Sequence, residues 1–356
     1  MSRRQKVGLI GAITGAVAVG AAAGLAAERY AIGRSRLGPD PAAKEPFFQL
    51  PADRTRRVIA DDGVPLHVEE IGPDTSGLTV VFCHGYTNQL AVWHFQRMAL
   101  AQEDVGKLVF WDQRSHGKSG RSSAKNATID QLGRDLHAVL NATAPRGRVI
   151  LVGHSMGGMT IMALADQHPE LFGERVVGVA LIATSTGKMA EVTFGLPAFF
   201  SGITKRALPF VTRGMLGQPQ LVERGRRMGT DLAFVATRRA AFGDNDVSPS
   251  LVEFVEKMTA DVPVDVIAEF FETFVDHDKL HALPALRGVE VLVLAGSEDV
   301  ITPADHSRTI ASELPHAQLV VVEGAGHMVQ LERAALVTLQ LRALVSRAVK
   351  AASRTA

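Results

Sequence analysis

The chain has 356 residues, of which 46% are hydrophobic and 21% charged, and its formal net charge is +1 at pH 7. This length and composition can bury the core of one large α/β domain, or of one domain with an insertion. The balanced charge gives no electrostatic basis for binding nucleic acid. Cys83 is the single cysteine, so an intrachain disulfide is excluded, and no Cys/His spacing indicates a metal site.

The chain opens with a basic stretch and then an apolar one. Residues 7–27 carry no charge, and at about 1.5 Å per residue this length can cross a ~30 Å hydrocarbon layer. We expect a single-pass membrane anchor. The alternatives are a cleaved signal peptide, which would make the protein exported, and a buried helix. Residues 37–51 are rich in proline and typical of a linker, so residues 1–50 form one predicted unit.

Strand and helix patterns alternate through residues 51–185, after a hairpin signal at Asp61-Asp62-Gly63. The predicted strands are 56–60, 65–71, 78–83, 107–111, 149–152 and 176–183, and the predicted helices are 92–102, 128–144 and 159–166. This alternation predicts an α/β fold with a mostly parallel central sheet covered by helices on both faces.

The alternation breaks at residues 186–286, where apolar clusters are interrupted by Pro and Gly and helical patterns cover 251–258 and 264–274. We interpret this region as a helical cap inserted over the sheet edge. Residues 287–356 return to the core pattern. They contain predicted strands at 289–295 and 318–322, a helix with Thr302 as N-cap and Pro303 next, and a last helix at 330–351.

The stretch Gly153-His154-Ser155-Met156-Gly157 lies between a predicted strand and a predicted helix. In that context, Gly-x-Ser-x-Gly predicts a nucleophile elbow with Ser155 at its tip. A tight turn would strain the backbone of Ser155, and side chains at Gly153 and Gly157 would collide with neighbouring backbone. We expect His154 to pack under the turn. The alternative is a glycine-rich turn with an incidental serine.

A serine nucleophile needs a general base and a carboxylate that orients the base. His327 and Asp299 each follow a predicted strand directly, which would bring both to the edge of the sheet beside Ser155. Glu298 is the alternative carboxylate. The chain order is then Ser, Asp, His, the order of this architecture.

Two backbone N–H groups are the predicted oxyanion hole. One belongs to Met156, directly after the nucleophile, because a helix begins there. The other should come from the loop after the strand at 78–83, where His84-Gly85-Tyr86 stands, and we select the N–H of Tyr86. His84 and Gly85 would support that loop. This chemistry uses no cofactor and no metal, and we predict neither.

With these residues in view, residues 54–350 resemble the α/β-hydrolase superfamily, in its serine-hydrolase branch with a helical cap. The matching motifs are His84-Gly85, Asp112-x-Arg114-x-His116-Gly117-x-Ser119, the elbow, Gly296-x-x-Asp299 and Gly326-His327. Serine at the elbow argues against the epoxide hydrolase and haloalkane dehalogenase branches, which resemble this chain but carry Asp there. We interpret the loop at 112–119 as structural, with Arg114 and Asp112 paired near the elbow.

These features predict a hydrolase that cleaves carboxylic esters through an acyl-enzyme. Its substrate would be a small-molecule or lipid-like acyl ester, because the cap is apolar and a membrane anchor would hold the site near lipid. Cofactor-free haloperoxidases and C–C bond hydrolases resemble the chain at the same motifs and are the alternative. A non-catalytic scaffold tethered to the membrane is the third hypothesis.

Overall fold

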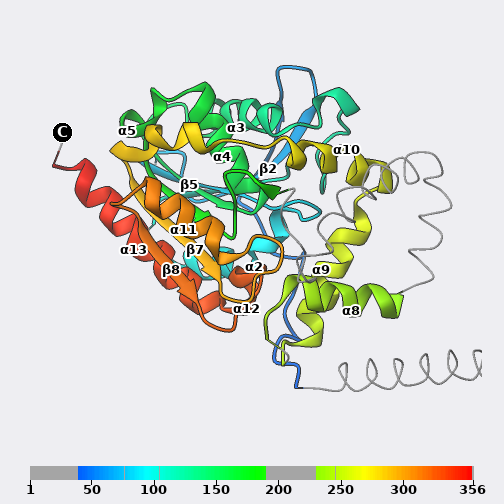
Figure 1. Ribbon diagram of the computed structural model, residues 1–356. Helices are drawn as coiled ribbons and strands as arrows, with labels where there is room; N and C mark the ends of the chain where they lie inside the picture. Colours follow the sequence, from blue (N-terminus) through cyan, green and yellow to red (C-terminus); the bar gives the residue numbers. More distant parts are fainter. Residues whose placement is uncertain (1–38, 76, 104, 190–229, 245, 355–356) are drawn as a thin grey trace, which may run out of the picture.

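Figure 1 shows the computed structural model of the chain, which describes residues 39–354 apart from 76, 104, 190–229 and 245. Its centre is an eight-stranded sheet with the order β1-β2-β4-β3-β5-β6-β7-β8. The strands are β1 (Arg54–Ile59), β2 (Pro65–Ile71), β3 (Leu78–Cys83), β4 (Lys107–Trp111), β5 (Arg148–His154), β6 (Val176–Ile182), β7 (Glu290–Gly296) and β8 (Gln318–Val322). Only β1–β2 and β2–β4 pair antiparallel, so the prediction of a mostly parallel sheet is confirmed.

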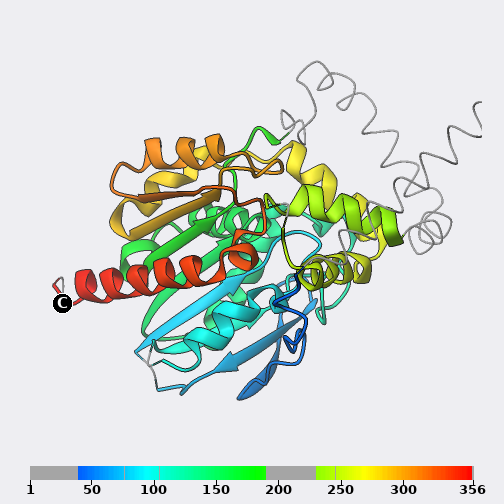
Figure 2. The ribbon, with the colours of Figure 1, turned by 90° about the horizontal axis from the view of Figure 1, so that it is seen from below.

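Helices cover both faces of this sheet. One face carries α3 (Ile129–Thr143), α4 (Met156–Gln167), α5 (Leu171–Glu174) and α11 (Ala304–Glu313), and the other carries α2 (His94–Leu100), α12 (Val329–Glu332) and α13 (Ala334–Ala352). Figure 2 shows the sheet between these layers. Alternate residues of β5 enter opposite cores, with Val149 and Leu151 on one side and Ile150 and Val152 on the other.

Several helix boundaries differ from the prediction. The last helix, expected at 330–351, is two helices, α12 and α13, separated at Arg333. The helix expected at 92–102 divides into a 3₁₀ turn, η1 (Leu90–Trp93), and α2. The elbow helix α4 begins at Met156 rather than at residue 159, because the turn leads straight into it. The prediction of Thr302 as an N-cap is wrong. Pro303 occupies that position, and the Thr302 hydroxyl is engaged by a carboxylate of the candidate site.

Between β6 and β7 the described elements are helices joined by loops. They form α8 (Thr230–Ala241), α9 (Pro249–Asp261), α10 (Val264–Val275) and the 3₁₀ segment η5 (Leu280–Gly288). Figures 1 and 2 show α8, α9 and α10 gathered at one end of the sheet. The helical patterns predicted at 251–258 and 264–274 correspond to α9 and α10. Residues 190–229 of the predicted cap lie outside the described part of the chain.

Residues 39–53, which we call the N-terminal strap, pack against both core and cap. Phe47 stacks on Phe254 of α9 with ring centroids 4.2 Å apart. The Asp40 carboxylate accepts a 2.6 Å hydrogen bond from the Ser250 hydroxyl, also in α9. On the core side, Arg97 of α2 donates to the carbonyl oxygens of strap residues 50 and 51. The proline-rich stretch predicted as a linker is therefore, from residue 39 onward, a packed part of the fold.

Within the residues that the structure describes, none of the helices combines the length and apolar character needed to cross a membrane. The predicted anchor, residues 7–27, lies outside that part of the chain. The anchor therefore stays a prediction.

Candidate active site

Ser155 stands at the junction of β5 and α4 with φ 53° and ψ −119°. A positive φ is a strained conformation for a residue with a side chain, so the turn must be imposed by its surroundings. A Cβ on Gly153 would lie 2.5 Å from the carbonyl oxygen of Gly157, and one on Gly157 would lie 2.1 Å from that of Cys83. Both collisions are those expected from the sequence, and they explain why glycines flank the serine.

The surroundings of Ser155 fix its backbone from two sides. Its N–H donates to the carbonyl oxygen of Ile182 in β6 over 2.9 Å, and its own carbonyl oxygen accepts from the Thr184 hydroxyl over 2.7 Å. On the other side, a Cβ on Gly85 would come within 3.1 Å of the Ser155 Cβ. The missing side chain of Gly85 therefore leaves the space that the serine occupies.

Asp299 and His327 are joined directly. His327 Nδ1 lies 2.8 Å from Asp299 Oδ2, and both side chains are buried. The other oxygen, Asp299 Oδ1, accepts from the backbone N–H groups of Ile301 and Thr302, each at 2.8 Å, and the Thr302 hydroxyl donates to Oδ2 at 2.8 Å. An ionised Asp299 can only accept, so His327 carries its proton on Nδ1 and leaves Nε2 as the basic nitrogen.

The Asp299 carboxylate is kept ionised inside the protein. Burial acts to raise the pKa of Asp299, but the charge and hydrogen bond of His327, together with the donors of Thr302, hold it below its usual value. An ionised carboxylate at this position stabilises a positive charge on the His327 ring. The pair can therefore accept and return a proton at the nitrogen that faces away from Asp299.

His154 packs beneath the elbow, as predicted, and links the two chain segments of the site. Its Nε2 lies 2.9 Å from the carbonyl oxygen of His327. Burial, and then the neighbouring His327, lower the pKa of His154 to about 3. The ring is therefore neutral and donates from Nε2.

Among the described residues, no hydrogen bond joins the Ser155 hydroxyl to the His327 ring. The His154 bond brings their backbones together.

The loop after β3 holds one of the predicted oxyanion donors. The carbonyl oxygen of Gly85 accepts from His84 Nδ1 over 2.7 Å and from the Asn88 N–H over 3.2 Å. A trans peptide is planar, so fixing this carbonyl also fixes the Tyr86 N–H on the opposite side of the same peptide. Within the described part of the chain, the Tyr86 N–H donates no backbone hydrogen bond.

The second predicted donor, the Met156 N–H, is the first of α4 and has no acceptor within its own helix. A buried polar network connects the loop that carries one donor with the helix that carries the other. His84 Nε2 accepts from the Gln113 N–H over 2.9 Å, the Gln113 side chain donates to the His84 carbonyl, and Thr160 of α4 donates to Gln113 Oε1 over 2.8 Å. Burial, and then His116, lower the pKa of His84 to about 3, which keeps this ring neutral.

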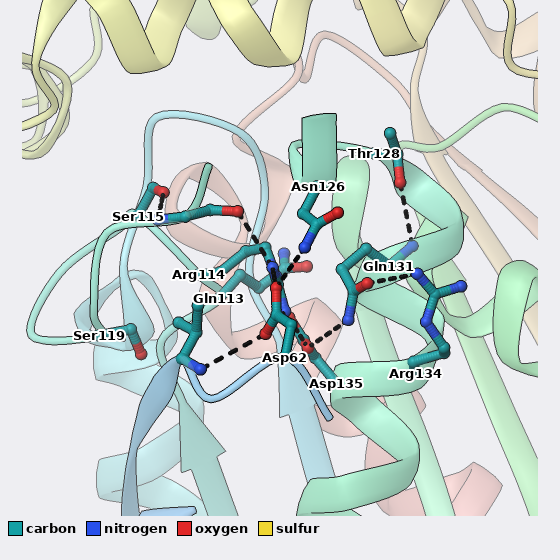
Figure 3. A network of polar contacts seen from close by, with 12 residues as sticks. Asp62, Gln113, Arg114, Ser115, Ser119, Asn126, Thr128, Gln131, Arg134 and Asp135 are labelled. Carbon is teal, nitrogen blue, oxygen red and sulfur yellow. Dashed lines mark hydrogen bonds and ion pairs between the residues drawn. The ribbon is translucent and has the colours of Figure 1, made fainter. Parts of the chain in front are cut away.

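Two further predictions concern neighbouring side chains. Glu298, the alternative carboxylate, accepts from the Ser297 hydroxyl over 3.2 Å and has no contact with His327 among the described hydrogen bonds. The predicted Asp112–Arg114 pair is wrong. Asp112 accepts backbone N–H groups instead, and Arg114 pairs with Asp135 of α3 and Asp62 of the β1–β2 hairpin, the network seen in Figure 3.

Sequence reasoning missed the support given by Thr302, Thr184 and Gln113. Asp299 accepts from the N–H groups two and three residues ahead, which is the local turn that Asp favours. The spacing Asp299-x-x-Thr302 therefore carried a signal. Thr184 and Gln113 carried none, because their contacts with the elbow are long-range.

Across the described residues, no group of three or more His, Cys, Asp or Glu side chains could hold a metal ion.

Comparisons with known proteins agree with this architecture. A family model described as the alpha/beta hydrolase fold matches residues 79–334. The chain is 26% identical over 276 residues to an sn-1-specific diacylglycerol lipase, ABHD11, of Mus musculus, over 76% of this chain and 81% of that protein. A thermophilic esterase from Thermogutta terrifontis aligns with a TM-score of 0.64 and 22% identity over 83% of this chain and 99% of that one, a likeness of fold.

A second curated relative is longer. The chain is 28% identical over 280 residues to the dihydrolipoyllysine-residue acetyltransferase component of the acetoin cleaving system of Pseudomonas putida. The match covers 78% of this chain but 65% of that protein, so the chain spans less than two thirds of its length.

Proposed function

This chain belongs to the α/β hydrolase fold family, and within it we propose a serine hydrolase that cleaves carboxylic esters. The observation that carries the proposal is the 2.8 Å bond between His327 Nδ1 and Asp299 Oδ2, set beside a serine with a φ of 53°. A basic nitrogen, its orienting carboxylate and a raised hydroxyl are the groups that acyl transfer from an ester requires.

In the proposed acylation step, Ser155 Oγ attacks the ester carbonyl carbon while His327 Nε2 takes the hydroxyl proton. Asp299 stabilises the imidazolium that forms. The oxyanion accepts hydrogen bonds from the N–H groups of Tyr86 and Met156, whose orientation is set before substrate arrives. The C–O bond of the ester then breaks, His327 returns the proton to the departing alcohol, and the acyl group stays on Ser155.

Deacylation repeats the sequence with water. His327 Nε2 removes a proton from a water molecule that attacks the acyl carbon, and the oxyanion forms again at the same two N–H groups. Collapse of this intermediate releases a carboxylic acid, and His327 returns its proton to Ser155 Oγ. Asp299 keeps the ring in one tautomer throughout.

We propose a lipid-like acyl ester as the substrate class, and a membrane as its place of action through residues 7–27. Two points support this. The relative from Mus musculus is named a diacylglycerol lipase, and the uncharged stretch at residues 7–27 is long enough to anchor the chain in lipid. A small-molecule ester is the competing substrate.

The test is hydrolysis of p-nitrophenyl esters of increasing acyl length by the full chain, because the strap at residues 39–53 is part of the fold. Ser155→Ala is expected to abolish turnover while Ser312→Ala, a matched change at an exposed helix position, leaves it unchanged. A rate that peaks at long acyl chains supports the lipid-like substrate, and a rate confined to short chains refutes it.

Undiminished hydrolysis by Ser155→Ala would refute the assignment of the nucleophile. An inert wild type that still reacts with a fluorophosphonate at Ser155 would redirect the proposal to peroxide-dependent halogenation or C–C bond hydrolysis. Lack of that reaction as well would favour the non-catalytic scaffold.

A further inference from the structure

Two cap helices touch the loop that contains the predicted oxyanion donor. The Tyr86 hydroxyl donates a hydrogen bond to the carbonyl oxygen of Ile267 in α10. The Tyr86 ring also packs edge-on against Phe274 of the same helix, with centroids 5.1 Å apart at 69°. The neighbouring hydroxyl of Thr87 accepts from Thr259 of α9 over 3.3 Å. The loop is therefore in contact with both helices.

Hydrogen bonds also hold this loop from the core side. Thr87 has a φ of 57°, a left-handed conformation, and its N–H donates to His116 Nε2 over 3.2 Å. The Asn88 side chain donates to the carbonyl oxygen of Tyr86 over 3.2 Å. Tyr86 therefore lies between the core contacts of Thr87 and Asn88 on one side and α10 on the other. Its backbone N–H is only a few covalent bonds from the ring that contacts the helix.

We propose that Tyr86 is a positioning residue that couples cap helix α10 to the oxyanion hole. Through its side chain, the orientation of the Tyr86 N–H depends on whether α10 is seated, which means packed against the 84–88 loop as in the structure. With α10 seated, its Ile267 carbonyl holds the Tyr86 hydroxyl, and the ring holds its own backbone N–H in place to receive an oxyanion. With α10 displaced, the hydroxyl loses its acceptor and the N–H loses that restraint. This inference rests on the proposed function, since it gives the Tyr86 N–H a role in that reaction.

The coupling predicts how a substrate would be selected. A transition state is stabilised only by donors that are already oriented. A substrate that leaves α10 seated would therefore be turned over with a high kcat, whereas one that displaces the helix would bind but react slowly. Discrimination would appear in kcat rather than in KM.

Another contact between α10 and the core supplies a matched control. The Ile129 N–H at the start of α3 donates to the Thr273 hydroxyl of α10 over 3.1 Å. This bond fastens the same helix to the core but touches no residue of the 84–88 loop. Tyr86→Phe and Thr273→Val each remove one hydroxyl and the hydrogen bond that it makes between the core and α10. Neither substitution changes the side-chain volume much.

The experiment compares these two variants in the full chain. Tyr86→Phe is expected to lower kcat for a p-nitrophenyl ester about tenfold with KM within about twofold, as loss of oxyanion alignment would. It should slow fluorophosphonate labelling of Ser155 to a similar degree, because that reaction also builds charge on an oxygen at the same donors. Thr273→Val should change each rate by less than about twofold. Equal effects of the two variants, or an unchanged kcat in Tyr86→Phe, would overturn the proposal.

Hydrogen–deuterium exchange separates this inference from the proposed function. Tyr86→Phe should raise exchange in residues 84–88, whereas Thr273→Val should raise it at the Ile129 N–H, which loses its acceptor, and leave residues 84–88 unchanged. If the wild type cleaves no ester, the ester assignment fails, but the labelling and exchange arms still test the coupling. If exchange in 84–88 is the same in both variants, the coupling fails even when the wild type is an esterase.

Discussion

The hydroxyl of Thr302 donates to Asp299 Oδ2 over 2.8 Å, on the oxygen that His327 Nδ1 also approaches at 2.8 Å. One oxygen of the carboxylate thus carries both the orienting bond to the proposed base and a bond to a neutral donor. Because Thr302 lies directly before the N-cap of α11, the position of that helix fixes the direction of the carboxylate.

Thr302→Val removes this donor and keeps the shape of the side chain. We expect kcat for ester hydrolysis to fall about tenfold, since one hydrogen bond to a buried charged group is worth about 1.5 kcal/mol. KM should stay near its wild-type value. Thr309→Val, at an exposed hydroxyl that bonds a carbonyl in α11, is the control, and an unchanged kcat in Thr302→Val would contradict the prediction.

Gly157→Ala tests the steric basis of the elbow. The added Cβ would lie 2.1 Å from the Cys83 carbonyl oxygen, a contact that backbone must move to relieve. We expect the free energy of unfolding to fall by about 2 kcal/mol or more and hydrolysis to be lost. Gly77→Ala is matched to it, since no atom lies within 4 Å of a Cβ at that position. Urea unfolding and ester hydrolysis measure both variants, and a fully active Gly157→Ala would be incompatible with the described turn.

Arg114→Met tests the buried ion-pair network of Figure 3. Arg114 Nε lies 2.6 Å from Asp135 Oδ2, and neither side chain is exposed. Burial already raises the pKa of Asp135 and Arg114 opposes that shift, so the variant leaves an uncompensated carboxyl inside the protein. Stability should fall by about 3 kcal/mol in urea unfolding. Arg308→Met removes an exposed pair with Asp305 and should change stability far less. Similar losses in the two variants would count against this account.

Buried histidines make stability depend on pH. Burial lowers the pKa of His84 to about 3, of His116 to about 4 and of His154 to about 3. An unfolded histidine titrates near 6.5, so below that pH the unfolded chain binds protons that the folded chain does not. Stability is therefore full above about pH 6.5 and falls as the pH drops, by up to about 1.4 kcal/mol per pH unit for each ring.

His116→Gln should reduce that slope by up to about 1.4 kcal/mol per pH unit between pH 6.5 and 5, the contribution of one such ring. Urea unfolding at several pH values gives the slope directly. A variant that keeps the wild-type slope would show that the His116 ring does not contribute to it.

The parts of this protein that sequence predicts well are those set by local sterics. The turn at Ser155 needs glycines at 153 and 157 whatever the rest of the chain does, and alternate residues of β5 must face two cores. The order of strands and helices follows from the same short-range patterns.

The parts that sequence did not predict depend on distant partners. Arg114 has acidic residues nearby in the chain, but its partner Asp62 lies 52 positions away on the β1–β2 hairpin. Proline in residues 37–51 indicates an extended backbone, yet nothing in that composition indicates that Asp40 meets Ser250, 210 positions ahead. Only the fold decides which of many possible polar pairs form.

The strap has a mechanical consequence. The first described side-chain contacts of the chain, at Asp40, are with Ser248 and Ser250 at the start of α9 in the cap rather than with the sheet. Tension applied to any segment ahead of residue 39 would therefore reach α9 before it reached the strands. Because Thr259 of that helix bonds Thr87, the load would pass on to the residue after Tyr86. A pull on the amino-terminal end of this fold is thus a pull on the cap.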